Sequence, residues 1–384
     1  MGKQVIYIDA GPILSDRLSG IGHLTLNMIR GLLAREDLKE FYEIRLLAPA
    51  AKAYLLKQWD LSDVKVTHIP LLARIWNVWP RFSFAPPIDL FLGKGVYLFP
   101  NYKRWPLMLS PSITYVHDIS FEIFPQFTEP RNLAMLRGNV PTWINKSTLV
   151  ITDSDSSKKE IIDHYEIKED KIRSIYCGVD ADLFQPASDA EVKAVKKKYG
   201  ISMPYLFFLS NLEPRKNIVR LIEAMQLLPQ AYKKKYALVM VGGMSWQNEE
   251  IHAAIDAATQ AGWTIIKPKA YVPDEDVPAL LTGAEMLVHP ALHEGFGIPV
   301  AEAMACGTAV VASDIPVLHE VAASAAVYAD PENPADIADK IQIVMTDESL
   351  RSRLQSAGLD RAQGFTWAEA TDRLVGYIKE ISRQ

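Results

Sequence analysis

The chain has 384 residues, of which 49% are hydrophobic and 23% are charged, and its formal net charge is −5. This composition is typical of a globular protein and excludes disordered, collagen-like and disulfide-rich classes. The negative charge argues against a nucleic-acid partner, because phosphate backbones are bound by clustered Lys and Arg.

Targeting and redox signals are weak in this sequence. No apolar run approaches the roughly 20 residues that cross a bilayer, and residues 3–9 predict a β-strand rather than a signal peptide. The two cysteines, Cys177 and Cys306, match neither a disulfide framework nor a metal-ligand spacing. We therefore expect a soluble, cytoplasmic protein, and the length predicts more than one domain.

The first half of the chain alternates short β-branched segments with longer amphipathic ones, a pattern typical of parallel α/β architecture. Strands are predicted at residues 5–9, 43–48, 64–69, 96–99, 113–117, 149–152 and 172–176. Helices are predicted at residues 21–34, 131–145 and 156–164. The pattern breaks around residues 177–180, and residues 184–187 predict a linker.

A second alternating series follows the linker. Its strands are predicted at residues 205–210, 237–241, 264–266, 286–289, 309–312 and 326–328. Its helices are predicted at residues 217–228, 249–261, 276–281, 299–305 and 334–345, and residues 368–381 predict a last helix that follows another helix. The two series predict two doubly wound parallel-sheet lobes facing a cleft, with ligands outside the carboxyl ends of the strands.

The segment from His293 to Met304 lies between a predicted strand and a predicted helix. Pro299 suits the first helical turn. The backbone amides of about residues 297–301 should therefore lack helical partners and form an anion site that fits a diphosphate. Gly295 and Gly297 would let a ligand approach the backbone closely.

Two carboxylates, Glu294 and Glu302, flank this predicted anion site. They would repel phosphate, so we expect them to accept hydroxyl groups, one at a hexose and one at a ribose. The alternative is that the glycines and the proline only shape a turn, while Glu302 complements the helix dipole.

Residues 211–217, Asn-Leu-Glu-Pro-Arg-Lys-Asn, lie in the same way between a strand and a helix. Arg215 and Lys216 would there neutralise a diphosphate and stabilise the charge that develops on a departing nucleoside diphosphate. The alternative is that both are ordinary surface residues beside a turn.

The first lobe offers two further candidates. Gly20 and Gly22 lie between a strand and a helix and predict a phosphate or sugar loop, although they do not form G-x-G-x-x-G. His117 and Asp118 close a strand at the same edge, where His117 would contact a sugar or orient the acceptor. The alternative for His117 is a buried histidine whose hydrogen bonds are satisfied.

Asp153-Ser154-Asp155 has the form of a D-x-D metal site. The following residues predict a helix, so we interpret the segment as a helix N-cap instead. No other cluster offers convincing metal ligands, and we expect no metal.

Together these motifs resemble the retaining nucleotide-sugar glycosyltransferases of family 4, which have the GT-B fold of two facing Rossmann-like lobes. The resemblance covers nearly the whole chain. It rests on Gly20 and Gly22, His117 and Asp118, residues 178–180, residues 212–217, Gly242 and Gly243 with Trp246, and the E-x₇-E pair Glu294 and Glu302.

The resemblance implies a donor site in the second lobe. Glu294 would contact the hydroxyls of the donor sugar and Glu302 the ribose, with Lys216 beside the diphosphate. Many members carry an arginine where this chain has Asn211, and Arg215 is the candidate substitute. The backbone near Tyr271 and Val272 would receive the base, and the amides of Phe296, Gly297 and Ile298 would hold the diphosphate. Gly243 is a further donor-side residue.

The resemblance also implies the organisation and the reaction. Residues 1–183 would bind the acceptor, residues 184–366 would bind the nucleotide sugar, and a helix at 367–384 would return to the first domain. Transfer would be retaining and metal-independent, with the leaving phosphate assisting the incoming hydroxyl and Glu294 not acting as a nucleophile. Residues 212–217 resemble those of mannosyltransferases of polysaccharide assembly, which favours GDP-mannose over its main rival, UDP-glucose.

A tryptophan-rich stretch at residues 74–105 includes Trp76, Trp79 and Trp105. These residues are candidates for docking a lipid-linked saccharide acceptor at a membrane surface. The alternative is core packing plus a mobile acceptor loop. Two other functions remain open at this point: a sugar-nucleotide epimerase on the same fold, and a non-catalytic sugar-binding protein.

Overall fold

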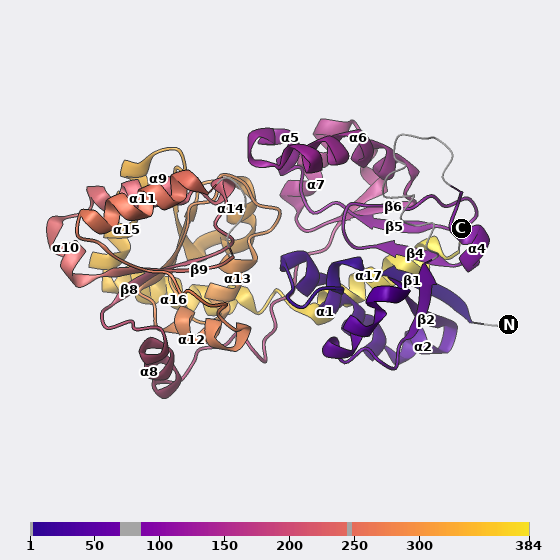
Figure 1. Cartoon of the computed structure of the whole chain (residues 1–384), viewed down its shortest axis with the longest axis horizontal. Coiled ribbons are helices and arrows are strands. Elements are labelled where there is room, and N and C mark those ends of the chain that lie inside the picture. Colours follow the sequence, from indigo (N-terminus) through magenta and orange to yellow (C-terminus); the bar gives the residue numbers. More distant parts are fainter. Residues whose placement is uncertain (1–2, 70–85, 244–247, 384) are drawn as a thin grey trace. The chain divides into compact units, whose positions relative to one another are not determined.

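The computed structural model describes residues 3–69, 86–243 and 248–383 of the chain. The chain divides into two compact units (Figure 1). The first unit comprises Met1–Ile123, Pro130–Gly178 and Trp367–Gln384, and the second comprises Phe124–Glu129 and Val179–Thr366. The main division thus follows Gly178, a few residues before the expected boundary.

The first unit is built on a parallel sheet whose strands, in the described residues, follow the order β3-β2-β1-β4-β5-β6-β7. These strands are β1 (Gln4–Asp9), β2 (Tyr42–Pro49), β3 (Lys65–Ile69), β4 (Val96–Phe99), β5 (Ser112–Tyr115), β6 (Leu149–Thr152) and β7 (Ile172–Ser174). The helices are α1 (Gly20–Ala34), α2 (Glu36–Phe41), α4 (Asp89–Leu92), α5 (Ser120–Ile123), α6 (Pro130–Lys146), α7 (Asp155–Tyr165) and α17 (Trp367–Ile381).

The second unit repeats this architecture around a parallel sheet of order β10-β9-β8-β11-β12-β13. The strands are β8 (Tyr205–Leu209), β9 (Ala237–Val241), β10 (Thr264–Ile266), β11 (Met286–His289), β12 (Val310–Ser313) and β13 (Ala326–Ala329). The helices are α8 (Asp189–Lys198), α9 (Ile218–Leu227), α10 (Gln230–Lys235), α11 (Glu249–Gln260), α12 (Val277–Thr282), α13 (Ile298–Ala305), α14 (Pro316–Ala322), α15 (Pro334–Thr346) and α16 (Glu348–Ala362).

Short 3-10 helices complete the chain. They are η1 (Gly11–Ile13), η2 (Ala50–Trp59), η4 (Pro125–Phe127), η5 (Glu169–Lys171), η6 (Pro214–Lys216), η7 (Asp274–Asp276) and η8 (Ala323–Ala325). In the part of the chain that the structure describes, no helix combines the length and the apolar character needed to cross a bilayer.

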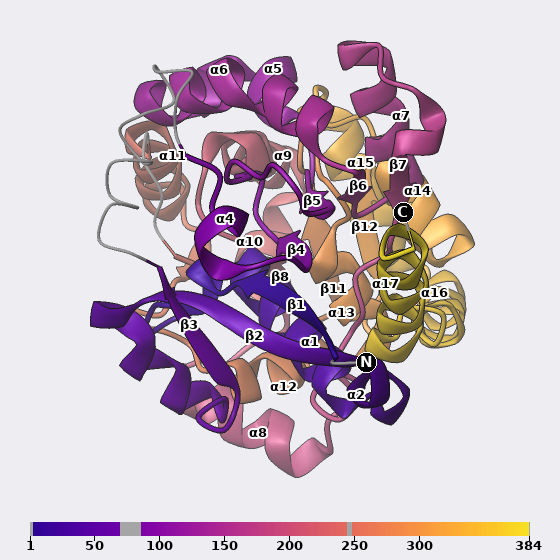
Figure 2. The ribbon, with the colours of Figure 1, turned by 90° about the vertical axis from the view of Figure 1, so that its right-hand side faces the viewer.

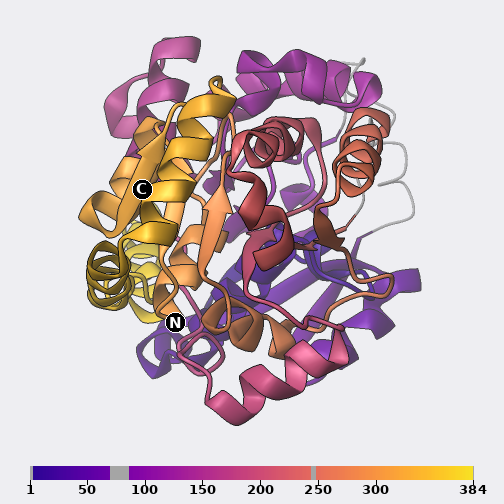
Figure 3. The same ribbon diagram turned by 90° about the vertical axis from the view of Figure 1, so that its left-hand side faces the viewer.

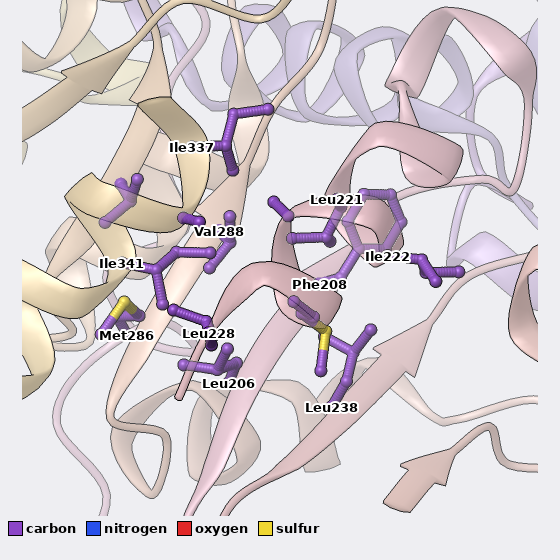
Figure 4. Close-up of a cluster of buried hydrophobic side chains, with 14 of the residues drawn as sticks. Leu206, Phe208, Leu221, Ile222, Leu228, Leu238, Met286, Val288, Ile337 and Ile341 are labelled. Atoms are coloured by element: carbon purple, nitrogen blue, oxygen red, sulfur yellow. The ribbon is translucent and has the colours of Figure 1, made fainter. Parts of the chain in front are cut away.

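Helices cover both faces of the second sheet (Figure 3), which explains why strands such as β9 and β11 are buried along their whole length. Alternate residues point to opposite faces, so Leu206 and Phe208 of β8 share one face. There they pack with Leu221 and Ile222 of α9 (Figure 4). Ile337 and Ile341 of α15 complete that layer of the core.

The last helix, α17, packs against α1 within the first unit (Figure 1). Gly31 of α1 permits this close approach, because a Cβ there would lie 2.1 Å from Thr371 Oγ1 of α17. Gly178 plays the same part at the start of α17, where a Cβ would lie 2.4 Å from the Trp367 backbone nitrogen. Leu374, Val375, Ile378 and Ile381 are buried along the covered face of α17.

Strand order reverses direction at one place in each sheet. In the first unit the reversal lies between β1 and β4, and in the second between β8 and β11. In open parallel sheets, ligands bind outside the carboxyl ends of the strands at such a point. The loops after β1, β4, β8 and β11 are therefore the first places to look for a site.

Candidate functional site

The loops after β8 and β11 meet at one buried carboxylate, that of Glu294. Lys216 donates from Nζ to Glu294 Oε1 at 2.6 Å, and His289 Nε2 lies 2.8 Å from the same oxygen. Arg215 donates to Glu294 Oε2 at 3.4 Å. Because β8 and β11 pair in parallel, their carboxyl ends place these three donors around one acid.

This cluster is a buried ion pair with a set protonation state. Burial on its own would raise the pKa of Glu294, but Lys216, His289 and Arg215 together hold that pKa well below its ordinary value. Burial lowers the pKa of Lys216, and so does the charge of Arg215, while Glu294 opposes both. Lys216 has three N–H donors, and within the described residues Glu294 is the one hydrogen-bond acceptor seen for them.

Arg215 joins the two loops to each other. Its guanidinium donates to the His293 carbonyl at 2.6 Å and to Glu213 Oε1 at 2.9 Å. Its own carbonyl accepts from the Leu292 amide at 2.9 Å. These contacts show that Arg215 holds the loop that carries Glu294. Its expected role at the diphosphate, as a substitute for an arginine at position 211, stays a prediction.

His289 is a site residue that the sequence did not indicate. It ends β11, is fully buried, and donates from Nε2 because the ionised Glu294 can only accept. Its Nδ1 is buried and has no hydrogen-bond partner among the described residues. A histidine at the carboxyl end of a strand on this edge was the available signal.

The amino end of α13 provides fewer amides than expected. Gly297 is its N-cap with a φ of 95°, and the Gly297 carbonyl already accepts from Val300 and Ala301. Of residues 297–301, Pro299 has no N–H, and Val300 and Ala301 already donate to the Gly297 carbonyl. Only the amides of Gly297 and Ile298 lack a backbone acceptor within the described residues. A Cβ at Gly297 would lie 2.7 Å from Leu318 Cδ2, so both the space and the φ require glycine.

Phe296 and the glycines after β9 shape the walls of the site. Phe296 is buried and packs edge-to-face against Phe365, with ring centroids 5.3 Å apart. Asn211 Oδ1 accepts from the Gly243 amide at 3.2 Å, which joins the loops after β8 and β9. A Cβ at Gly242 would lie 1.8 Å from the Ser210 carbonyl oxygen. Trp246, part of the resemblance, lies outside the described residues.

Glu302 lies in α13 near Asp274 and Tyr271. Burial, together with the charge of Asp274, raises the pKa of Glu302 to about 8. Tyr271 donates from its hydroxyl to Asp274 Oδ1 at 2.9 Å, and the neighbouring Val272 is buried. The structure thus places the residues expected at the ribose and base end in one part of the second unit.

In the first unit, His117 is buried and both of its ring nitrogens are occupied. Nδ1 lies 2.9 Å from Asp153 Oδ2, and Nε2 lies 2.8 Å from the Pro100 carbonyl oxygen. A carbonyl only accepts, so Nε2 carries a proton. This geometry favours the alternative of a satisfied buried histidine over a direct contact between the His117 ring and a sugar.

The D-x-D segment is explained by two different interactions. Ser154 is the N-cap of α7 and accepts from the Ser157 amide, as expected for a helix start. The prediction that Asp153 belongs to the same cap is wrong, because its carboxylate pairs with His117 instead. Asp155 accepts from the Tyr176 hydroxyl at 3.3 Å. In the described parts of the chain, no group of three or more His, Cys, Asp or Glu is arranged to hold a metal ion.

We predict that Asp153→Asn destabilises the protein, and more strongly at low pH. Burial opposes protonation of His117, but the Asp153 charge and hydrogen bond raise its pKa above the ordinary value. The free energy that this pair adds to folding is therefore fully present below the pKa that His117 has in the unfolded chain. It is lost as the pH rises through the higher pKa that His117 has in the folded protein. Urea unfolding of both proteins between pH 5.5 and 9 checks this. Asp163→Asn, an exposed acid, is the control, and a pH-independent difference contradicts the prediction.

The remaining first-unit candidates have structural contacts. Ser19 caps α1 and accepts from the Gly22 amide at 3.3 Å, and a Cβ at Gly22 would lie 3.1 Å from the Pro12 carbonyl oxygen. Gly20 begins α1 and has open space around it. Asp118 Oδ1 accepts from the Ser120 amide at 3.0 Å at the start of α5.

The tryptophans separate into two groups. Trp105 is buried in the core with Tyr97 and Phe99, so the core-packing alternative is correct for it and the acceptor-side prediction is wrong. Trp76 and Trp79 lie outside the described residues.

The reversal point of the first sheet carries two charged residues, of which Lys103 belongs to the tryptophan-rich stretch and Asp9 was not indicated by the sequence. Asp9 ends β1, and Lys103 follows β4, which pairs with β1. Burial raises the pKa of Asp9 and lowers that of Lys103, and the attraction between their charges opposes both shifts. Lys103 Nζ also lies 5.9 Å from the Trp105 ring centroid.

Comparison with known families gives matches in both units. Residues 18–183 match the family described as Glycosyltransferase Family 4, and residues 191–361 match Glycosyl transferases group 1. The chain is 33% identical over 373 residues to O-antigen chain mannosyltransferase B of Escherichia coli, covering 94% of this chain and 96% of that one. It is 30% identical over 226 residues to serotype-specific mannosyltransferase WbdA of Escherichia coli, covering 58% of this chain but only 28% of that protein.

Solved structures are similar along the whole chain. Sucrose-phosphate synthase from Thermosynechococcus elongatus has a TM-score of 0.72 at 16% identity, with all of both chains covered. WaaG, a glycosyltransferase involved in lipopolysaccharide biosynthesis, has a TM-score of 0.67 at 14% identity, covering 97% of this chain and 99% of that one. At these identities the likeness concerns the fold.

Proposed function

Because the chain belongs to the glycosyltransferases and has their GT-B fold, as the sequence predicted, we propose that it transfers mannose from GDP-mannose to a glycan or lipid-linked saccharide in polysaccharide assembly. The donor rests on the full-length relative named as a mannosyltransferase. We further propose family 4 membership, a retaining outcome and no metal requirement. The observation that carries the proposal is the buried Lys216–Glu294 pair at the carboxyl edge of the second sheet.

The proposed donor pose places the diphosphate between Lys216 and α13. The spare N–H donors of Lys216 and the amides of Gly297 and Ile298 would bind the phosphate oxygens. These groups are held in place before the substrate arrives, so they stabilise the charge that grows on the leaving phosphate without reorganisation. The bond between the anomeric carbon and the phosphate oxygen breaks, the acceptor oxygen bonds to the same face, and its proton passes to the leaving phosphate.

Glu294 would bind a hydroxyl of the transferred sugar. Its Oε1 already accepts from Lys216 and His289 and its Oε2 from Arg215, so of the roughly four lone-pair sites of an ionised carboxylate about one, on Oε2, is left for a hydroxyl donor. The same contacts depress its pKa, which makes it a poor proton acceptor. This supports a role in orienting the sugar rather than in removing a proton.

Glu302 would bind the ribose, and its protonation predicts a pH dependence of nucleotide binding. With a pKa raised to about 8, Glu302 is mostly protonated at neutral pH, whereas accepting from both ribose hydroxyls requires the ionised form. We expect GDP affinity to rise up to about tenfold per pH unit up to that pKa and then to level off. Calorimetric titration between pH 6 and 9 measures this.

The glutamine variant of Glu302 distinguishes this site from general pH effects. Glu302→Gln should bind GDP more weakly at high pH and show little pH dependence. Glu348→Gln removes an exposed first-turn acid of α16 and should behave like the wild type. If the wild type and Glu302→Gln share one pH profile, Glu302 does not bind the ribose.

The acceptor side of the proposal uses the reversal point of the first sheet. Asp9 ends β1 there, and Lys103 lies in the loop that follows β4. A carboxylate and an ammonium together accept from and donate to sugar hydroxyls, which suits a saccharide acceptor. Asp118 lies after the adjacent strand β5.

A product assay separates this function from its rivals. The protein is incubated with GDP-mannose, UDP-glucose or ADP-glucose, with and without a mannose-terminated oligosaccharide, and free nucleoside diphosphate and sugar products are measured. Release of GDP that requires the acceptor, with an α-linked product, supports the proposal. If the donor is converted into another sugar nucleotide without acceptor, the protein is an epimerase. If UDP is released when acceptor is present, it is a glucosyl-type transferase. If a sugar alone raises the melting temperature and no product forms, it is a binding protein.

A further inference from the structure

Four large apolar side chains are exposed together on two segments of the first unit. Leu90 and Phe91 of α4 are 52% and 65% exposed, and Met108 and Leu109 of the following loop are 68% and 52% exposed. We call these four residues the apolar tip. Both segments precede strands, α4 before β4 and residues 106–109 before β5, so the tip lies at the amino edge of the first sheet, in the region of α4 in Figure 2.

The apolar tip is held in place by buried polar contacts. The Asp89 side chain is buried, and its carboxylate accepts from the Met108 amide at 3.0 Å and from the Leu109 amide at 2.7 Å. The Ile88 amide donates to the Pro106 carbonyl at 2.9 Å. These bonds hold α4 and the loop together, with all four apolar side chains more than half exposed. Large exposed apolar patches of this kind mark interaction surfaces.

The surroundings of the apolar tip are basic, although the whole chain carries a net charge of −5. Lys94 is exposed just after α4, and Lys146 is exposed just before β6. Lys171 donates to the Asn145 carbonyl at 2.5 Å, and its charge interacts with that of Arg104. The charge of Arg104 interacts in turn with that of Asp89, which lies beneath the tip.

The acids near these lysines offset only part of their charge. Asp89 is buried and bonded to amides, and Glu169 pairs with Lys158. Asp170 lies beside Lys171 and counteracts it. The amino edge around β4 to β7 therefore combines protruding apolar groups with positive charge.

We propose that the apolar tip inserts into the surface of an anionic phospholipid bilayer. Apolar side chains that reach the acyl boundary, with lysines at the level of the headgroups, are the pattern by which proteins bind such a surface without spanning it. The ligand edge of the same sheet, at the carboxyl ends of β1 and β4, then faces away from the bilayer. The inference stands on the exposed residues and is independent of which sugar is transferred.

Flotation with vesicles tests the proposal. The full-length protein is mixed with vesicles of phosphatidylcholine alone or with phosphatidylglycerol. We expect binding to the mixed vesicles, a loss of about fivefold for each of Lys94→Gln and Lys146→Gln, and a loss of at least about tenfold for the double variant Phe91→Ser and Met108→Ser. The matched control is Leu227→Ser with Ile343→Ser, which removes two exposed apolar residues of the second unit and should bind like the wild type.

A labelling experiment locates the contact independently of these losses. Both native cysteines, Cys177 and Cys306, are buried, so an environment-sensitive dye attaches selectively at Phe91→Cys or at Leu227→Cys. On mixed vesicles, the dye at position 91 should shift to shorter wavelength and the dye at position 227 should not. The proposal is overturned if the wild type does not float with the vesicles or if the dye shifts equally at both positions. It is also overturned if the protein self-associates in sedimentation and the double variant Phe91→Ser with Met108→Ser abolishes this, because a second copy is then the partner.

Discussion

Replacing Lys216 by Met lowers kcat by about 10²–10³-fold, the scale observed when one preorganised donor is removed from developing negative charge. The Lys216 ammonium is buried against Glu294, and Lys216 ends η6 just before α9, on the edge where the proposed diphosphate binds. Its loss removes both a donor to the leaving phosphate and the partner that keeps the sugar-binding carboxylate in position. A steady-state assay at saturating donor measures the change.

The design of this experiment must separate catalysis from stability. Lys216→Met leaves Glu294 buried with one donor fewer, which costs about 3–5 kcal/mol if the charge remains uncompensated. The double variant Lys216→Met with Glu294→Gln removes that charge, so it should regain thermal stability while remaining inactive. Lys340→Met breaks only a half-buried ion pair with Asp336 within α15, away from the site, and serves as the control. A loss of less than threefold in folded Lys216→Met protein means that the leaving group binds elsewhere.

Ending the chain after Thr366 prevents the first unit from folding. The deleted helix α17 buries Leu374, Val375, Ile378 and Ile381. At about 1.5–3 kcal/mol for each buried side chain, these four contribute about 6–12 kcal/mol, which is comparable to the whole stability of a domain. The second unit ends at Thr366 and keeps its own core, so calorimetry should show its unfolding transition alone.

Point variants of the same helix pair provide the control for this deletion. Gly376→Ala in α17 adds a Cβ that meets nothing within 4 Å and should raise stability by up to about 1 kcal/mol. Gly31→Val in α1 forces a Cβ toward Thr371 and should destabilise the first unit by about 1–3 kcal/mol. A truncated protein that retains both unfolding transitions would show that α17 is dispensable for the first unit.

The secondary structure was predictable because most elements carry a strong periodic signal. The strands expected from the sequence occur in the structure with ends that differ by a residue or two, as at β5 and β7. Short helices such as α4, α5 and α10 were not predicted, since four to six residues hold too little of a helical period to identify. The GT-B fold itself was predicted and is confirmed.

The site was only partly predictable, because side-chain pairing depends on sheet order. Glu294, Lys216 and Glu302 follow strands and start helices, so local pattern identified them. The pairings of His289 with Glu294 and of Asp153 with His117 were not predicted, because each depends on which strands are neighbours in the sheet. Trp105 was misplaced for the same reason, since only the fold shows which aromatic side chains the core contains. Roles for these residues in catalysis remain predictions.

The membership of α17 in the first unit also bears on how the protein is made. The strands of the first unit leave the ribosome early, but the helix that covers α1 follows residues 179–366 of the second unit in the chain and is therefore translated after them. The apolar stripe of α1 therefore stays uncovered while the entire second unit is being translated, although nascent domains ordinarily fold from the N-terminus onward. In synthesis, the second unit should be complete first, and chaperone contact should concentrate on the segment that contains α1.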